Sequence, residues 1–63
     1  MCTIKQQVEY ANSRGVGQFH LFEGEQYRTT WRSYGTAKAL ADKYGHTVYN
    51  DSGRAVYRNG KEI

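Results

Sequence analysis

The chain has 63 residues, a length that allows one domain with a small hydrophobic core. It has a single cysteine, which excludes an internal disulfide, and no apolar run approaches the roughly 20 residues needed to span a bilayer. The net charge of +3 permits contact with nucleic acid or an acidic protein, but it falls well short of a polybasic segment.

The N-terminal sequence shows no cationic start leading into an apolar run, so it does not have the pattern of a signal peptide. Together with the unpaired cysteine, this predicts a cytoplasmic protein without a membrane partner. Met1 stands just before a helix start, which indicates a complete small open reading frame.

A first helix is predicted at 4–13. Thr3 and Gln6 have the spacing of a capping box. Three apolar residues then recur at helical intervals: Ile4, Val8 and Ala11. Gly15 suits the left-handed position that follows the end of a helix, so we expect the helix to end just before it.

Two strands of a hairpin are predicted at 17–22 and 26–32, joined by a tight connection at 23–25. In the second strand, simple alternation puts Tyr27, Thr29 and Trp31 on one face. The other face then carries Gln26, Arg28, Thr30 and Arg32. Because Trp31 shares its face with Tyr27, we expect Trp31 to lie in the core.

A second helix is predicted to begin at the N-cap Thr36 and to end at Gly45. Its apolar face consists of Ala37, Leu40, Ala41 and Tyr44. Strands at 46–50 and 54–58 follow, joined by a turn that contains Gly53. Asn59 and Gly60 begin another turn, so residues 61–63 form either a frayed end or a short extra strand.

These elements predict a single α+β domain that covers residues 1–63. The element order is α-β-β-α-β-β. The simplest packing is one antiparallel sheet of three to four strands, with both helices on one face.

The sequence offers few groups for catalysis. Cys2 can act as a nucleophile with His20 or His46, or it is an ordinary thiol near the terminus. Glu23 and Glu25 can form a carboxylate pair, or they belong to a charged hairpin tip. No Cys/His cluster has metal-ligand spacing. We therefore expect a protein that is not an enzyme and has no cofactor or metal.

Arginine and tyrosine provide the candidate binding residues. If the two hairpins join in one sheet, four arginines can line its open face, and Tyr34 in the loop after the second strand adds an exposed contact. The predicted binding residues are Arg28, Arg32, Tyr34, Arg54 and Arg58. The alternative is that these arginines only keep the exposed face soluble and block edge pairing.

The function expected from this pattern is binding. We predict a small protein that modulates or inhibits a larger protein or nucleoprotein complex, as accessory proteins of phages and mobile elements do in host takeover or defence evasion. The first alternative is a direct nucleic-acid binder that uses the same arginines. A homodimer joined through an unpaired strand edge such as 54–58 is the second alternative.

Overall fold

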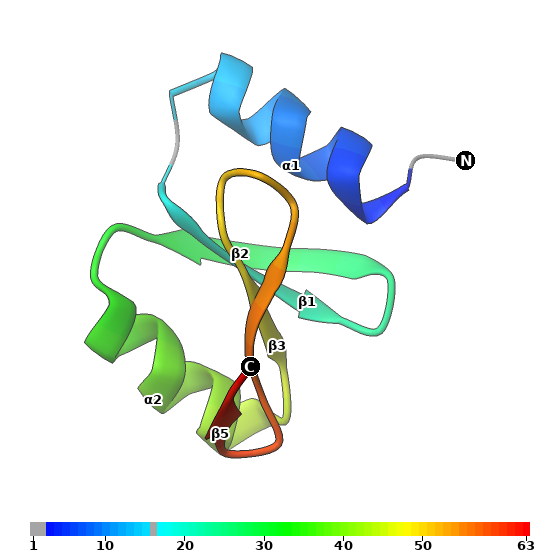
Figure 1. Ribbon diagram of the computed structural model, residues 1–63. Coiled ribbons are helices and arrows are strands. Elements are labelled where there is room, and N and C mark those ends of the chain that lie inside the picture. The colour runs from blue at the N-terminus through cyan, green and yellow to red at the C-terminus, as the bar shows by residue number, and fades with distance from the viewer. Residues whose placement is uncertain (1–2, 16) are drawn as a thin grey trace.

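The computed structural model describes residues 3–15 and 17–63. It confirms the α+β class, with two helices and one antiparallel sheet of five strands (Figure 1). The elements are α1 (Ile4–Ser13), β1 (Phe19–Glu23), β2 (Gln26–Trp31), α2 (Tyr34–Tyr44), β3 (Thr47–Tyr49), β4 (Ala55–Arg58) and β5 (Lys61–Glu62). The predicted count of three to four strands is one too low because residues 61–62 form β5, the short extra strand.

The strand order in the sheet is β2-β1-β3-β4-β5. The two hairpins join where β1 pairs with β3, for example at Leu21 and Val48. Asn59 and Gly60 have φ of 55° and 76°, the left-handed values that a tight hairpin turn requires, so the chain turns back and β5 covers β4. The strand at 54–58 is therefore internal, and the prediction that it offers a dimer edge is wrong. The edges of the sheet are β2 and β5.

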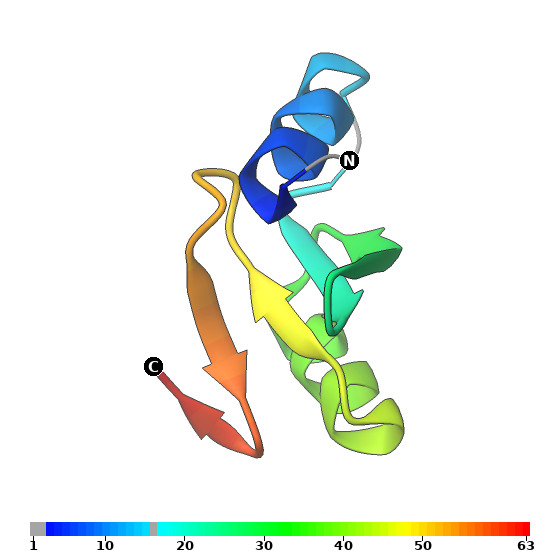
Figure 2. The same cartoon turned by 90° about the vertical axis from the view of Figure 1, so that its right-hand side faces the viewer.

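The helices lie on opposite faces of the sheet, so the prediction that both cover one face is wrong (Figure 2). Strand β1 is the reason, since its side chains are buried on both faces. Leu21 packs with Ala37 and Ala41 of α2. His20 and Phe22 point the other way and are fully buried on the side of α1. A strand that is buried on both faces needs a cover on each.

Helix ends follow local signals closely. Thr3 and Gln6 form the predicted capping box, with reciprocal bonds of 2.9 and 3.1 Å. Helix α2 begins one turn earlier than predicted, because Ser33 rather than Thr36 is its N-cap. The Ser33 hydroxyl accepts a hydrogen bond from the Thr36 amide at 3.4 Å. Gly45 ends α2 in the left-handed conformation, as expected.

A β-bulge at Arg28 changes which residues of β2 share a face. Leu21 pairs with Thr29, whereas Phe22 pairs with Tyr27, so Arg28 is the extra residue. Tyr27 consequently shares the face of Phe22, and their ring centroids are 5.0 Å apart. Trp31 stays on the opposite face at the end of the strand and is 40% exposed. The predictions that Tyr27 and Trp31 share a face and that Trp31 lies in the core are both wrong.

Tyr57 ties β4 to α2 and makes stability depend on pH in the alkaline range. Its hydroxyl lies 2.8 and 2.9 Å from the two carboxylate oxygens of Asp42. That hydrogen bond, with burial and nearby negative charge, raises the pKa of Tyr57 above its ordinary value. A raised pKa in the folded state means that this contribution to stability is complete below the unfolded pKa, about 10. It is lost as pH rises from there through the folded pKa.

We expect Tyr57→Phe to weaken this alkaline loss of stability. Urea unfolding followed by circular dichroism, between pH 8 and pH 11.5, measures it. The wild-type midpoint should fall more steeply above about pH 10 than the Tyr57→Phe midpoint. Tyr10→Phe controls for removal of an exposed tyrosine hydroxyl. Equal slopes in the wild type and Tyr57→Phe would contradict the assignment.

Candidate protein-binding surface

Exposed aromatic side chains gather around strand β2. The exposed large hydrophobic residues among those described are Tyr10, Trp31, Tyr44 and Ile63. Trp31 ends β2, while Tyr10 of α1 and Tyr44 of α2 line hollows on either side of this strand. We use the term β2-edge surface for Tyr10, Arg14, Arg28, Trp31 and Tyr44 together with the outer edge of β2.

Strand β2 lies at the end of the sheet, and in the described part of the chain it pairs only with β1. Backbone N–H and C=O groups on the outer edge of such a strand remain available to another chain. The bulge at Arg28 bends β2, which limits long and indiscriminate edge pairing. The straight part between Thr29 and Trp31 remains as a short edge.

Two hollows flank this edge. The first, between α1 and β2, measures about 330 Å³ and is called the α1-side hollow. Its lining residues are Gln7, Tyr10, Ala11, Arg14, Tyr27, Thr29 and Thr30. The second, between α2 and β2, measures about 220 Å³ and is called the α2-side hollow. Its lining residues are Leu21, Arg28, Thr29, Leu40, Tyr44 and His46. Thr29 lines both, so the hollows meet at the strand edge.

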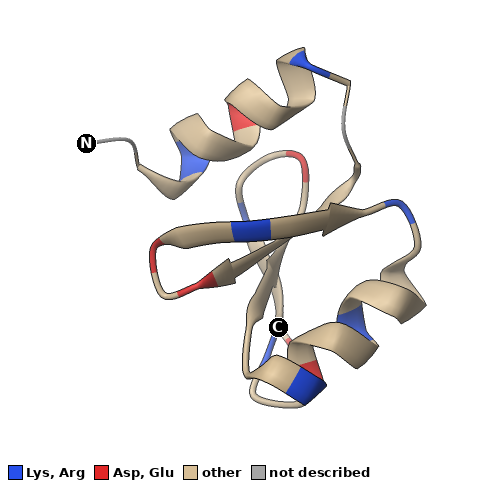
Figure 3. Ribbon diagram, turned by 180° about the vertical axis from the view of Figure 1, so that it is seen from behind, with Lys and Arg blue, Asp and Glu red and all other residues tan. Residues whose placement is uncertain are grey.

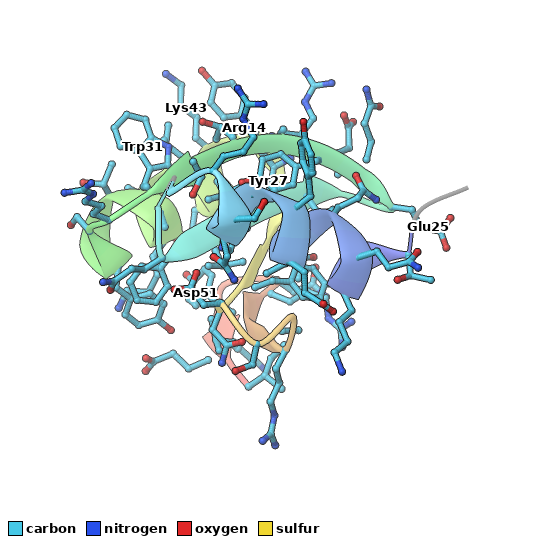
Figure 4. All side chains as sticks on the ribbon, turned by 90° about the horizontal axis from the view of Figure 1, so that it is seen from above. Arg14, Glu25, Tyr27, Trp31, Lys43 and Asp51 are labelled. Carbon is cyan, nitrogen blue, oxygen red and sulfur yellow. The ribbon has the colours of Figure 1, made fainter. Side chains whose placement is uncertain are left out.

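Cations accompany the aromatic rings of this surface. The Arg14 guanidinium lies 5.7 Å from the centroid of the Tyr10 ring, and its Nη1 donates to the Tyr10 hydroxyl at 3.1 Å. Lys43 Nζ lies 5.3 Å from the centroid of the Tyr44 ring. Figure 4 shows Arg14, Trp31 and Lys43 along the outer side of β2, away from Asp51. The surface therefore combines apolar rings with positive charge.

A hydrogen-bond network centred on the buried His20 holds together the elements that carry this surface. His20 has no exposed area; its Nδ1 lies 2.8 Å from the Tyr27 hydroxyl and its Nε2 lies 2.8 Å from Asp51 Oδ1. Asn12 of α1 donates to the backbone oxygen of Asp51 at 2.8 Å. The network thus links β1, β2, α1 and the turn between β3 and β4.

The same network fixes the position of the Tyr27 side chain. Burial is the main cause that raises the pKa of Tyr27, the Asp51 carboxylate raises it further, and a hydrogen bond with Thr30 opposes them. The hydroxyl therefore stays protonated at neutral pH, whereas a nucleophile or base would need a lowered pKa. Tyr27 presents a fixed ring to the α1-side hollow.

The structure does not bring the four predicted arginines together. Arg28 lies in β2, Arg32 follows its end, and Arg54 and Arg58 flank or end β4. Strands β1 and β3 separate β2 from β4, which sets those strands about 14 Å apart. Figure 3 shows lysine and arginine distributed over both helices, β2 and the connecting loops, interspersed with acidic residues. Of the four, only Arg28 belongs to the β2-edge surface; Arg32 lines a separate hollow with Asp51.

Tyr34, the fifth predicted binding residue, begins α2 and is half-buried. Its ring stacks on Phe19 with centroids 5.0 Å apart, and Lys38 Nζ lies 4.7 Å from the ring centroid. Its hydroxyl lies 3.1 Å from Glu62 Oε1 and 3.4 Å from the Val56 backbone oxygen. These contacts tie α2 to β4 and β5 and leave little of Tyr34 for a partner.

Residues 3–15 and 17–63 contain no group of three or more His, Cys, Asp or Glu side chains that could hold a metal ion. Neither described helix has the length and apolar character needed to cross a bilayer. Cys2, which the sequence offers as a nucleophile, lies outside the described residues. His20 and His46 are sheet or sheet-adjacent residues, as expected.

Comparisons with protein-family models, curated proteins and solved structures find no match for this chain.

Proposed function

We propose that this protein is a non-enzymatic binding protein that captures a larger protein, alone or within a nucleoprotein complex, through the β2-edge surface. One observation carries the proposal: exposed aromatic residues and arginines converge on an unpaired strand edge. Tyrosine, tryptophan and arginine are the residue types that dominate binding energy at protein interfaces. Scattered arginines mixed with acidic residues support a protein partner more than a nucleic acid.

The size of the chain fits the role of a modulator or inhibitor. A standard interface buries roughly 800 Å² on each partner. That is a substantial part of the 4361 Å² of accessible surface of this chain. A chain that buries so large a share of its surface in one contact would act by covering a face of its partner. We include in the proposal a phage accessory or anti-defence role and a cytoplasmic location, which suits the single cysteine.

The first test uses two matched pairs of charge reversals. Arg28→Glu with Arg32→Glu alters the β2 side, whereas Arg54→Glu with Arg58→Glu alters the β4 side by the same charge. Immobilised chains capture partners from a cell lysate, and calorimetry with the purified partner gives the affinity. We expect the first pair to weaken binding at least tenfold, because partly desolvated arginines at interfaces contribute about 1–2 kcal/mol each. The second pair should bind like the wild type.

The other outcomes identify other surfaces or ligands. Loss of binding only in the Arg54/Arg58 pair would move the site to β4 and contradict the proposal. Fluorescence anisotropy with labelled single- and double-stranded DNA and RNA tests the nucleic-acid alternative at low and near-physiological salt. Binding that persists at the higher salt and disappears in the Arg28/Arg32 pair would make nucleic acid the ligand.

A further inference from the structure

We propose that the partner segment binds as an added β-strand along β2, with a large apolar side chain in the α1-side hollow and an adjacent acidic side chain in the α2-side hollow. This inference rests on the proposed function and specifies the chemistry of the partner. It makes a stronger claim than surface contact, since it fixes both the backbone conformation and two neighbouring residues of the segment.

The outer edge of β2 can accept a further strand. The strand is an edge strand, and its outer side pairs with no other strand in the described part of the chain. An extended peptide that adds to such an edge gains main-chain hydrogen bonds, which are largely independent of its sequence. The bulge at Arg28 confines regular pairing to the short stretch from Thr29 to Trp31. We therefore expect a short extended segment and not a long strand.

The two hollows determine which side chains of an added strand can be bound. Successive side chains of a strand point to opposite faces of the sheet. The α1-side hollow lies on one face of β2 and the α2-side hollow on the other, and both include Thr29. Two residues that are adjacent in an added strand beside Thr29 would therefore enter different hollows. In this arrangement the hollows select particular side chains of the segment, while main-chain hydrogen bonds to β2 supply affinity.

The α1-side hollow suits a large apolar side chain. Its walls include the rings of Tyr10 and Tyr27 and the methyl group of Ala11, around a space of about 330 Å³. The hydroxyl of Tyr27 is already bonded to His20, and that of Tyr10 to Arg14, so the rings rather than the hydroxyls face a ligand. A buried aromatic or branched aliphatic side chain contributes about 1.5–3 kcal/mol of hydrophobic stabilisation.

The α2-side hollow suits a carboxylate. Arg28 and His46 line it, and Lys43 lies next to its Tyr44 wall. The Nδ1 atom of His46 is buried, so the half-exposed Arg28 side chain is the cation of this hollow that a ligand can reach. The described acidic residue paired with Arg28 is Glu23, at 3.7 Å and exposed, an arrangement that contributes little and exchanges readily. A carboxylate from the partner would pair with the Arg28 guanidinium, and Lys43 nearby adds a second positive charge.

A second copy of the chain fits this edge less well. Antiparallel pairing of two β2 strands about Thr30, the middle of the straight stretch, would bring Arg28 of each copy opposite Arg32 of the other, and like charges opposite one another are destabilising. Strand β2 also lacks the pair that the hollows require, since it has no acidic residue next to a large apolar one. Charge complementarity therefore favours a partner with an acidic and apolar segment.

Selection from a displayed library of random 12-residue peptides on the immobilised full-length chain tests the inference. We expect enriched peptides to share a large apolar residue directly adjacent to Asp or Glu. A synthetic peptide of that type should slow amide hydrogen exchange in β2 on binding. Arg28→Glu should weaken this peptide at least tenfold and shift the selection toward Lys or Arg. The control Arg58→Glu makes the same charge change and should leave both results unchanged.

The remaining outcomes separate this inference from the proposed function. Peptides that need Arg28 and Trp31 but lack the adjacent pair, or that leave β2 amides unprotected, would overturn strand addition and leave the binding surface standing. Failure to enrich any peptide would also overturn the inference, while lysate capture still tests the surface. Dimer formation at high concentration with protection of β2 would show that a second copy is the occupant, which contradicts the inference.

Discussion

Replacing His20 with alanine is expected to destabilise the fold by about 3 kcal/mol, the combined effect of a cavity and of broken buried hydrogen bonds. His20 has no exposed area, and both ring nitrogens have partners at 2.8 Å. Its loss leaves the Tyr27 hydroxyl and the Asp51 carboxylate without their shared partner. A domain of this size has a total stability of about 3–9 kcal/mol, so the substitution would remove between about a third and all of it.

Urea unfolding followed by circular dichroism measures the effect of His20→Ala. The control is His46→Ala, since His46 is half-buried and its Nδ1 has no hydrogen-bond partner in the described chain. That change should cost less than about 1 kcal/mol. Tyr27→Phe removes only one bond of the network and should cost about 1–2 kcal/mol in a protein that still folds. Equal stability in the His20→Ala and His46→Ala variants would refute a structural role for the network.

Gly17→Ala is expected to have a similarly large effect, about 3 kcal/mol, which combines the strain of a left-handed alanine with a steric overlap. Gly17 has φ of +57°, and an added Cβ would overlap the Thr30 side chain. Thr30 cannot readily move away, because its hydroxyl donates to the Phe19 backbone oxygen at 3.2 Å. The close approach of these two residues fixes the entry of the chain into β1.

Gly24→Ala separates the two causes. Gly24 has φ of +63°, and an added Cβ there meets nothing within 4 Å. This variant therefore has the backbone strain without the overlap and should lose about 1 kcal/mol, or roughly 4–8 °C in Tm. Gly17→Ala should lower Tm by about 12 °C or more on the same scale. A Tm for Gly17→Ala as high as that for Gly24→Ala would mean that the Thr30 contact imposes no constraint.

The candidate surface was only partly predictable. Arg28 and Arg32 could be predicted because they lie in the one strand where arginine, tyrosine and tryptophan occur together. Tyr10 and Tyr44 could not, since helical spacing does not tell which residue at the margin of an apolar stripe stays exposed. Both residues contribute because α1 and α2 lie on opposite faces of β2. That arrangement depends on contacts between elements far apart in the chain.

The local elements of this protein depend on residues that are close together in the chain. The capping box at Thr3, the left-handed glycines at 15, 45 and 53 and the approximate places of the four predicted strands depend on a few residues each, and the structure contains them. The tertiary structure alone decided the pairing of β1 with β3, the bulge at Arg28 and the bond between His20 and Asp51. These features join residues that no local pattern relates, because they form only when burial of both faces of β1 brings the two hairpins and both helices together.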